Sequence, residues 1–208
     1  MKLRYFNILI AVASMLLFIK GGENESFVPL APLNESEIAY YHTLFNANPA
    51  FKADGFDFPV GKPNAEGYYV AQDFRANNHL GEDWNGRGGG NTDLGDPVYA
   101  IADGYVKLAK EFKSGWGNII RMVHYLEEPP YYIVESLYAH CDEIYVTKGQ
   151  TVKRGDLIGT IGNVKGLYSA HLHLEMRSNV MLPIGTAYSK KTEGFMDPTD
   201  FIDLHRPK

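Results

Sequence analysis

Near its C-terminal end the chain reads Ala170-His171-Leu172-His173-Leu174-Glu175-Met176. Successive side chains of a β-strand point to opposite faces of a sheet. As a strand, this segment places His171, His173 and Glu175 on one face. Leu172 and Leu174 then point to the other face, toward a hydrophobic core. Because imidazoles bind divalent cations, the segment predicts a strand beside a metal site, with Glu175 as a partner that fixes the tautomer of a histidine.

A second set of candidate ligands lies upstream in Asn78-His79-Leu80-Gly81-Glu82-Asp83-Trp84, where His79 and Asp83 occur four positions apart. With the H-x-H pair they supply the ligands of a catalytic zinc site, in which three protein ligands leave one position open. Either segment alone is a weak indication, because an isolated H-x-H is more often a polar strand face. A third segment, Ser136-Leu137-Tyr138-Ala139-His140, adds a further histidine.

The order of these polar residues resembles that of the lysostaphin-like or LytM-type zinc endopeptidases, which cleave peptide cross-links in bacterial cell walls. In chain order the residues are His79, Asp83, His140, His171 and His173. The resemblance runs from about Phe56 to Ile202, and its further matches are Pro97-Val98-Tyr99-Ala100 with Asp103-Gly104, Gly115-Trp116-Gly117-Asn118 and the stretch Lys148–Gly159.

The resemblance implies a zinc ion bound by His79, Asp83 and His173. These ligands contribute one negative charge, so the centre would keep a positive charge that acidifies bound water and polarises a scissile carbonyl. The same resemblance leaves His140 and His171 as histidines that do not bind the metal. An unperturbed histidine pKa of about 6.5 suits proton transfer near neutral pH. One of the two is expected to act as base while the other stabilises the oxyanion, and the pattern leaves the order of these roles open.

The function implied by the resemblance is that of an exported zinc metalloendopeptidase, with the stem peptides of peptidoglycan as substrate. Two alternatives stay open. One is a non-catalytic LytM-type scaffold that activates a cell-wall amidase, and the other is a zinc peptidase that acts on protein or on a competitor's wall. Scaffolds of that kind lose ligand residues, whereas this chain keeps every position. The bond that is cleaved within the cross-link is left open.

The rest of the chain indicates a mainly β protein. Its 14 Tyr and 11 Phe, with short apolar runs broken by Gly and Asn, favour strands over helices. We expect an antiparallel barrel or sandwich of the duplicated hybrid motif of LytM-type proteins, with a short N-terminal helix. A glycine-rich loop at residues 85–95 is expected to be mobile and to shape the substrate groove. The expected strands are Val98–Ile101, Tyr105–Lys110, Asn118–Tyr125, Tyr132–His140, Asp156–Ile161 and His171–Arg177.

Residues 1–20 are predicted to be a signal peptide. Basic residues precede an apolar run, Tyr5–Ile19, which is the order of a secretory n-region and h-region. The run is shorter than the roughly 20 residues of a membrane span, so cleavage near Gly21 or Gly22 is expected, with an uncleaved tether as the alternative. The protein is therefore expected to be exported to the periplasm, the cell envelope or the extracellular space, with transient membrane contact through the signal.

The remaining chain is expected to comprise a linker with a short amphipathic helix at 21–53, a zinc metallopeptidase domain at 54–204 and a tail at 205–208. Asn34 and Glu37 have the form of a capping box before apolar residues at helical spacing, and Pro49 ends the pattern. We expect this helix to pack against the β domain. The alternative is that the segment lies across the cleft and restrains activity.

Charge and cysteine content narrow the partners. The chain has 20 Lys and Arg against 25 Asp and Glu, a net charge of −5, and removal of three basic residues with the signal gives −8. No nucleic-acid partner is expected for so acidic a chain. The single cysteine, Cys141, can form no internal disulfide and is expected to be a buried thiol, because Cys141 and His140 point to opposite faces of a strand. A monomer is favoured, and the oligomeric state is left open.

Overall fold

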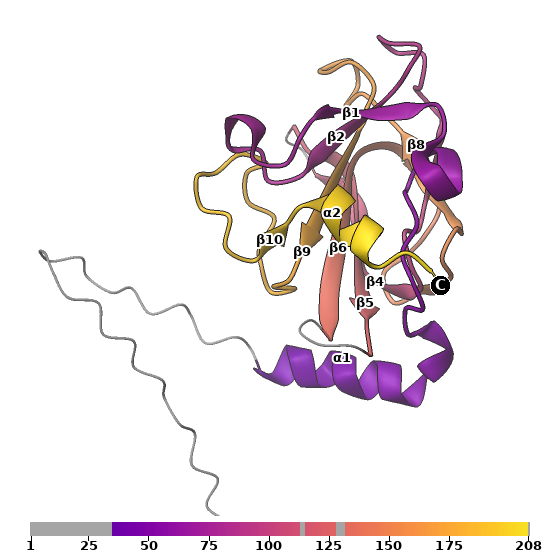
Figure 1. Ribbon diagram of the computed structural model, residues 1–208, viewed down its shortest axis with the longest axis vertical. Coiled ribbons are helices and arrows are strands. Elements are labelled where there is room, and N and C mark those ends of the chain that lie inside the picture. Colours follow the sequence, from indigo (N-terminus) through magenta and orange to yellow (C-terminus); the bar gives the residue numbers. More distant parts are fainter. Residues whose placement is uncertain (1–34, 113–114, 128–131, 208) are drawn as a thin grey trace, which may run out of the picture. The chain divides into compact units, whose positions relative to one another are not determined.

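The computed structural model describes residues 35–112, 115–127 and 132–207. The predicted signal peptide and residues 21–34 of the predicted linker and helix segment lie outside these residues. Within them, neither α-helix has the length and apolar character that crossing a membrane requires. The elements in chain order (Figure 1) are α1 (Glu35–Ala47), the short helical turns η1 (Pro49–Phe51) and η2 (Gly61–Ala65), β1 (Tyr68–Gln72), the turn η3 (Ala76–Asn78), β2 (Glu82–Gly86), β3 (Pro97–Tyr99), β4 (Gly104–Phe112), β5 (Gly117–Tyr125), β6 (Ile133–Ile144), β7 (Thr151–Val152), β8 (Leu157–Ile161), β9 (Leu172–Arg177), β10 (Phe195–Met196) and α2 (Pro198–Leu204).

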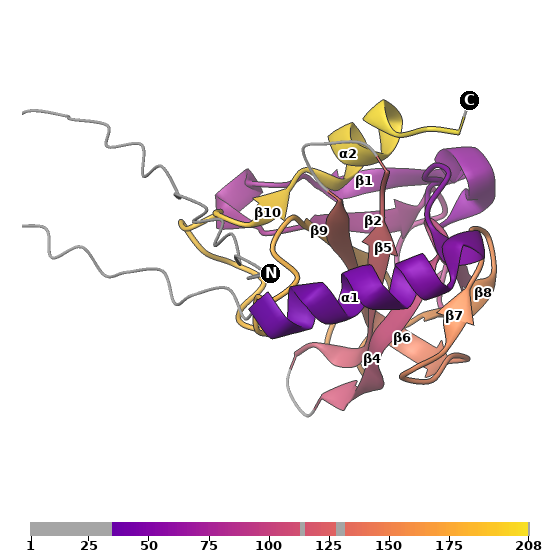
Figure 2. The same ribbon diagram turned by 90° about the horizontal axis from the view of Figure 1, so that it is seen from below.

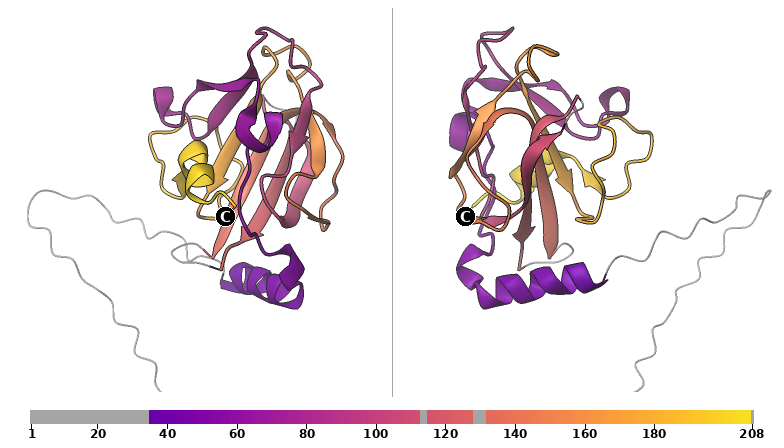
Figure 3. Two further views of the ribbon diagram at one scale, coloured as in Figure 1. Left: turned by 45° about the vertical axis from the view of Figure 1, so that its right-hand side comes forward. Right: turned by 180° about the vertical axis from the view of Figure 1, so that it is seen from behind.

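The ten strands of the described residues form one sheet, whose main path runs β1-β2-β9-β6-β5-β4-β7. β10 pairs with β9, and β8 pairs with both β3 and β6. The predicted mainly antiparallel β architecture with a short N-terminal helix is confirmed. Within the described residues β1 and β7 do not pair, so the sheet is not closed into a barrel. Figure 3 shows from two sides how the strands of the sheet curl.

β9 lies between β2 and β6 and has different chemistry on its two faces. Leu172, Leu174 and Met176 belong to the main hydrophobic core and are completely buried. The polar residues between them, His173 and Glu175, are as deeply buried, with exposures of 1% and 0%. The predicted alternation of apolar and polar side chains along this strand is therefore confirmed.

β6 is longer than predicted. It continues to Ile144, past the predicted end at His140. Beyond His140 the strand leaves β9 and pairs with β8, and its register shifts between Cys141 and Ile144. A change of pairing partner with a shift of register thus occurs where the sequence predicts an end. The predicted set does not include β1, β2, β7, β10 or α2.

A buried chain of hydrogen bonds ties β6 to β5. The His124 ring donates from Nδ1 to the carbonyl of Asp103 (2.9 Å), and its Nε2 lies 2.8 Å from the Ser136 hydroxyl. Ser136 Oγ is 3.2 Å from the Tyr138 hydroxyl, which accepts the N–H of Ile101 (3.0 Å). Each of the buried side chains His124, Ser136 and Tyr138 therefore has a hydrogen-bond partner, as buried polar groups in folded proteins usually do.

α1 packs across the ends of the central strands (Figure 2). Its Tyr41 and Phe45 are buried against Val123 of β5 and Ile133 of β6. The predicted amphipathic helix is confirmed, while the predicted cap residue Asn34 lies outside the described residues. α1 lines no part of the cavity described below. The packing role therefore holds for α1, and the alternative position across the cleft does not.

α2 supports the sheet from its core side. Asp197 caps its N-terminus by accepting the N–H of Asp200 (3.0 Å), and Pro198 follows in the first turn, where proline fits a helix. Phe201 and Ile202 are buried in the main core. α2 contacts β9, so the C-terminal helix helps to hold the strand that bears the site.

Candidate metal centre

Two neighbouring strands bring the predicted ligands together. β2 and β9 pair with Asp83 directly opposite His173. His79 comes from the turn before β2, where its N–H donates to the carbonyl of Ala76 (3.0 Å). In this turn Asn77 has a positive φ of 54°, a conformation that asparagine adopts more readily than most residues. The turn folds His79 back toward β2, and a bridge to Tyr188 holds its other side.

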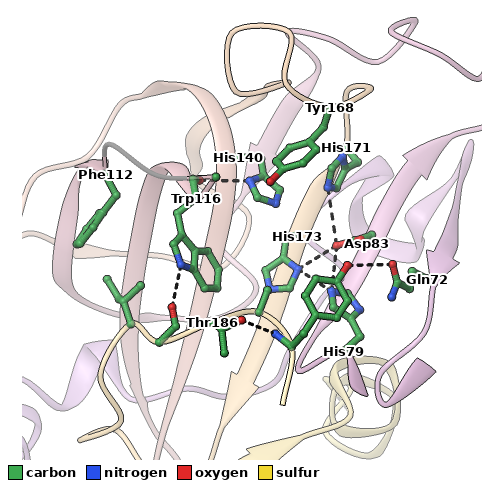
Figure 4. A pocket seen from close by; sticks show the side chains of 15 residues that line it. Gln72, His79, Asp83, Phe112, Trp116, His140, Tyr168, His171, His173 and Thr186 are labelled. Atoms are coloured by element: carbon green, nitrogen blue, oxygen red, sulfur yellow. Dashed lines mark hydrogen bonds and ion pairs between the residues drawn. The ribbon is translucent and has the colours of Figure 1, made fainter. Parts of the chain in front are cut away.

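The three ligand atoms are close enough to share one ion (Figure 4). Asp83 Oδ1 lies 2.9 Å from His173 Nδ1 and 3.4 Å from His79 Nε2. The two nitrogens are 3.0 Å apart. Tetrahedral zinc with bonds of about 2.0–2.1 Å to nitrogen and oxygen has ligands roughly 3.3 Å apart, so both the donor types and the spacing fit zinc. Among the described residues, the group of His, Cys, Asp or Glu side chains whose ligand atoms lie close enough together to hold one metal ion consists of His79, Asp83 and His173.

Glu175 holds the far side of the His173 ring. Its Oε1 lies 3.2 Å from His173 Nε2. The carboxylate accepts the Nε2–H, so Nδ1 keeps its lone pair for a metal. Glu175 is therefore in the position of the tautomer-fixing partner that the sequence predicts. Because both side chains are buried, water does not compete for this contact.

The electrostatics of the centre favour a positive charge. Burial alone raises the pKa of the Asp83 carboxyl, but hydrogen bonds from His173 and His79 outweigh it and hold that pKa well below its usual range. Burial alone lowers the pKa of His173, but its hydrogen bonds to Asp83 and Glu175 outweigh this effect and raise the pKa to about 9. A pocket that stabilises an imidazolium also suits a divalent cation, whose binding displaces the proton.

His140 of β6 and His171, which directly precedes β9, lie beside the ligands. Their ring centroids are 4.7 Å apart. Each ring donates its Nδ1–H to a backbone carbonyl, that of Trp116 for His140 (3.2 Å) and that of Ser169 for His171 (2.8 Å). Nε2 of each neutral ring is then the nitrogen with an available lone pair. Both histidines can therefore exchange a proton through Nε2.

The backbone of His140 is strained. Its φ of 62° is in the left-handed region, which costs a residue with a large side chain roughly 1–3 kcal/mol. The carbonyl of Trp116 holds it there, since it accepts both the backbone N–H (3.0 Å) and the ring Nδ1–H. Burial, together with the charges of His173 and His171, lowers the pKa of His140 to about 3, so its ring is neutral. Strain of this kind concentrates at functional sites.

All five residues predicted for the site line one cavity of about 620 Å³ (Figure 4). The structure thus brings together His79, Asp83, His140, His171 and His173, while the division into ligands and catalysts stays a prediction. The cavity is completed by Gln72, Phe112, Gly115, Trp116, Tyr168, Ile184, Gly185, Thr186, Ala187 and Tyr188.

Gln72, Tyr168 and Tyr188 are cavity residues for which the sequence predicts no site role. Tyr188 stacks on the His79 ring with centroids 5.1 Å apart, and its hydroxyl donates to Gln72 Oε1 (3.2 Å). Tyr168 lies with its ring centroid 5.2 Å from that of His140. Tyr168 and Tyr188 lie outside the named strands and helices, and no spacing in the sequence marks a loop residue that reaches a distant site.

The glycine-rich loop at residues 85–95 lines no part of this cavity, so the expectation that it shapes the groove is wrong. Two of its residues hold Ala170: Asn91 Oδ1 accepts the N–H (2.8 Å), and Asn85 Nδ2 donates to the carbonyl (3.1 Å). Ala170 directly precedes His171. The loop therefore supports the start of the ligand strand from outside.

Cys141 is buried next to the site and does not face it. Its side chain is 4% exposed and belongs to the main hydrophobic core. Burial raises the pKa of its thiol to about 12, so the thiolate does not form near neutral pH. The prediction of a buried structural thiol is confirmed.

The segment that holds the centre matches a known family. The family model described as Peptidase family M23 matches residues 78–183, just over half of the 208 residues, and this span includes all five polar residues of the site. The chain belongs to peptidase family M23. The resemblance to lysostaphin-like and LytM-type enzymes that the motifs indicate is thereby confirmed.

Relatives of this M23 chain include a peptidase and an activator. The chain is 35% identical over 85 residues to the peptidoglycan DD-endopeptidase ShyB of Vibrio cholerae, which covers 41% of this chain and 18% of ShyB. It is 38% identical over 86 residues to the murein hydrolase activator NlpD of Escherichia coli, which covers 40% of this chain and 20% of NlpD. The matched M23 segment thus spans about a fifth of either relative.

A solved structure shares the fold. The structure of the SpoIIQ-SpoIIIAH pore-forming complex contains a chain that superimposes with a TM-score of 0.52 at 21% identity. The match covers 74% of the M23 chain and 92% of the other chain. At this identity the likeness concerns the fold alone.

Proposed function

We propose that this M23 chain is a zinc metalloendopeptidase that hydrolyses peptide cross-links of bacterial peptidoglycan. The observation that carries the proposal is one cavity in which a zinc ligand set lies beside two histidines with available Nε2 atoms. A cell-wall substrate is supported by the relatives, since ShyB is a peptidoglycan endopeptidase and NlpD a murein hydrolase activator by name.

The ligand set would be His79 through Nε2, Asp83 through Oδ1 and His173 through Nδ1. Zinc bound there supplies a Lewis acid that activates water and polarises the scissile carbonyl. Glu175 keeps His173 in the tautomer that presents Nδ1. Tyr188, stacked on the His79 ring, restricts the rotation of that ligand.

His140 and His171 would move the protons. Because a backbone carbonyl accepts Nδ1–H of each ring, proton exchange with the substrate takes place at Nε2. The neutral ring takes a proton from the attacking water, and the protonated ring donates to the oxyanion and then to the leaving amine. With ring centroids 4.7 Å apart, both rings reach the same peptide bond.

The cavity walls suit an extended peptide with short side chains. Small residues near the centre leave room for the backbone of a substrate, and aromatic rings provide flat apolar walls. Cross-links built from alanine and glycine are short enough for such a groove, whereas bulky side chains would meet the rings. The residues concerned are Gly115, Gly185, Ala187, Phe112, Trp116, Tyr168 and Tyr188.

The alternative function is that of a non-catalytic activator of a cell-wall amidase, which the name of NlpD favours. An activator needs the fold but neither the ligands nor the proton carriers. Here the ligand spacing fits zinc, and the backbone strain at His140 is maintained at a cost in stability. These features support an enzyme. A peptidase for protein or for a competitor's wall would share this site and differ in substrate.

Digestion of purified peptidoglycan tests the proposal. We expect the zinc-loaded protein to release fragments cut at stem-peptide cross-links, identified by mass spectrometry, and His173→Ala to release none. If the protein leaves peptidoglycan intact by itself but makes its digestion by an added amidase faster, the protein is an activator. Cleavage of an unfolded protein substrate without cleavage of peptidoglycan would identify a general protease.

We place the site of action outside the cytoplasm, in the cell envelope. Peptidoglycan is there, and the signal-like order of residues 1–20 supports export, although these residues lie outside the described part of the chain.

A further inference from the structure

The largest completely buried side chain of the described residues is charged. Arg177, the last residue of β9, is 1% exposed. A guanidinium in such a position is strongly destabilising unless acceptors surround it. Arg177 lies on the same face of β9 as His173 and Glu175. The proposed catalytic mechanism assigns it no role.

Arg177 reaches toward the metal centre in one direction. Its Nε donates to Glu175 Oε2 (2.7 Å), and its Nη2 lies 2.5 Å from the same oxygen. The other carboxylate oxygen of Glu175 is the one that accepts from His173 Nε2 (3.2 Å). Arg177 therefore fixes the carboxylate that in turn fixes the ring of a proposed ligand.

Arg177 reaches toward the groove in the other direction. Its Nη1 donates to the carbonyls of Leu182 (3.3 Å) and Pro183 (3.4 Å). The next residues, 184–188, form a continuous part of the cavity lining. One planar guanidinium thus contacts both the support of the ligand and the chain segment that becomes the groove wall.

Arg121 provides the matched comparison. It is also buried, at 7% exposure, and makes two hydrogen bonds to the buried carboxylate of Glu135 (2.7 and 2.8 Å). Its Nη2 donates to the carbonyl of Leu182 (2.7 Å), as Arg177 does to the same atom. Arg177 Nη1 also approaches Glu135 Oε1, at 3.5 Å. The two arginines share these partners. The polar contacts that the structure gives to Arg177 and not to Arg121 are those with Glu175 and with the Pro183 carbonyl, and the contact with Glu175 is the one that leads to the ligand His173.

We propose that Arg177 is a positioning residue of the zinc centre, which orients His173 through Glu175 and sets the groove wall relative to that ligand through the carbonyls of Leu182 and Pro183. The proposal rests on the proposed function and deepens it. Lysine at this position keeps the charge but is a point donor, so it does not bind the carboxylate and both carbonyls in one fixed plane.

The test compares Arg177→Lys with Arg121→Lys in the full chain, using zinc alone as the probe in competition with a chromogenic chelator. We expect Arg177→Lys to weaken zinc binding by roughly 10–100-fold, the usual effect of removing a partner that orients a ligand. Hydrogen exchange at residues 184–188 should also become faster. Arg121→Lys should lower the thermal midpoint and leave zinc affinity unchanged.

Wild-type zinc affinity in a folded Arg177→Lys protein overturns the proposal, as does an equal loss of affinity in both variants, which would indicate general loosening of the interior. If Arg177→Lys does not fold, the charge-balanced double variant Glu175→Gln, Arg177→Met replaces it, and wild-type affinity there again overturns the proposal. If zinc binding depends on Arg177 but the wild-type protein cleaves no peptidoglycan, the proposed function is refuted and the positioning role of Arg177 is kept.

Discussion

Acid should destabilise the folded chain through His124 in a calculable way. The ring is 0% exposed, and burial lowers its pKa from 6.5 to about 4 despite the hydrogen bond to the Asp103 carbonyl. The folded protein therefore keeps a neutral ring over a range in which the unfolded chain binds a proton. Stability from the neutral ring is fully present above pH 6.5 and is lost as the pH falls through 4.

The size of the effect follows from that window. Each pH unit between the two pKa values is worth about 1.4 kcal/mol, so the free energy of unfolding should fall by about 3 kcal/mol from this residue alone. Acidic and other basic groups also titrate in this range. Comparison with His124→Gln isolates the contribution, because glutamine keeps polar contacts to Asp103 and Ser136 but does not titrate.

Urea unfolding at pH 7 and pH 4 measures the contribution of His124 to the free energy of unfolding. A chelator is present so that pH-dependent metal binding does not add to the difference. Between these pH values the free energy of unfolding of the wild type should fall by about 3 kcal/mol more than that of His124→Gln. The control is His42→Gln, which removes a partly exposed histidine from α1. Parallel losses in the wild type and His124→Gln would refute the reasoning.

Three further predictions concern the site, α1 and export. His173→Ala should lose both zinc and turnover. His140→Ala and His171→Ala should keep about one zinc per chain and lose roughly 10²–10⁴-fold in the rate of muropeptide cleavage, with zinc content measured by metal analysis. A full rate in either of these two variants would contradict the proton-transfer roles. Phe45→Ala should cost about 3–5 kcal/mol of unfolding free energy in urea, because a completely buried ring is removed, with zinc binding unchanged. Deletion of Tyr5–Ile19 should retain the protein in the cytoplasm in a fractionation assay, and unchanged export would refute the signal assignment.

The parts of the site that the sequence predicts are those governed by local geometry. Alternation along a strand places His173 and Glu175 on one face whatever the rest of the fold does. His79 and Asp83 were also recognised as a pair from their spacing of four residues, although the strand β2 that carries Asp83 was not predicted. The start of α2 is also marked in the sequence by Asp197 and Pro198, a cap followed by a first-turn proline, although α2 was not predicted.

The remaining parts depend on contacts between distant segments. Tyr188 reaches His79 from a loop, and Gln72 joins it from β1, so no local pattern connects them. Arginine is usually exposed, and composition therefore gives no reason to expect Arg177 inside the protein. Its burial follows from the acceptors that β9 itself, β6 and the segment after β9 place around it.

Because β9 has one apolar face and one polar face, the length of this strand cannot change without moving side chains to the wrong face. Inserting or deleting one residue within Leu172–Arg177 would exchange the faces of every side chain beyond that point, which would move leucines into the metal centre and charges into the core. Length changes are therefore compatible with activity only outside the strand. Loop residues 163–169 and 184–187, which lie on either side of β9 in the chain and contribute cavity residues, are where a designer should lengthen or shorten the chain to alter substrate choice while keeping the metal ligands in place.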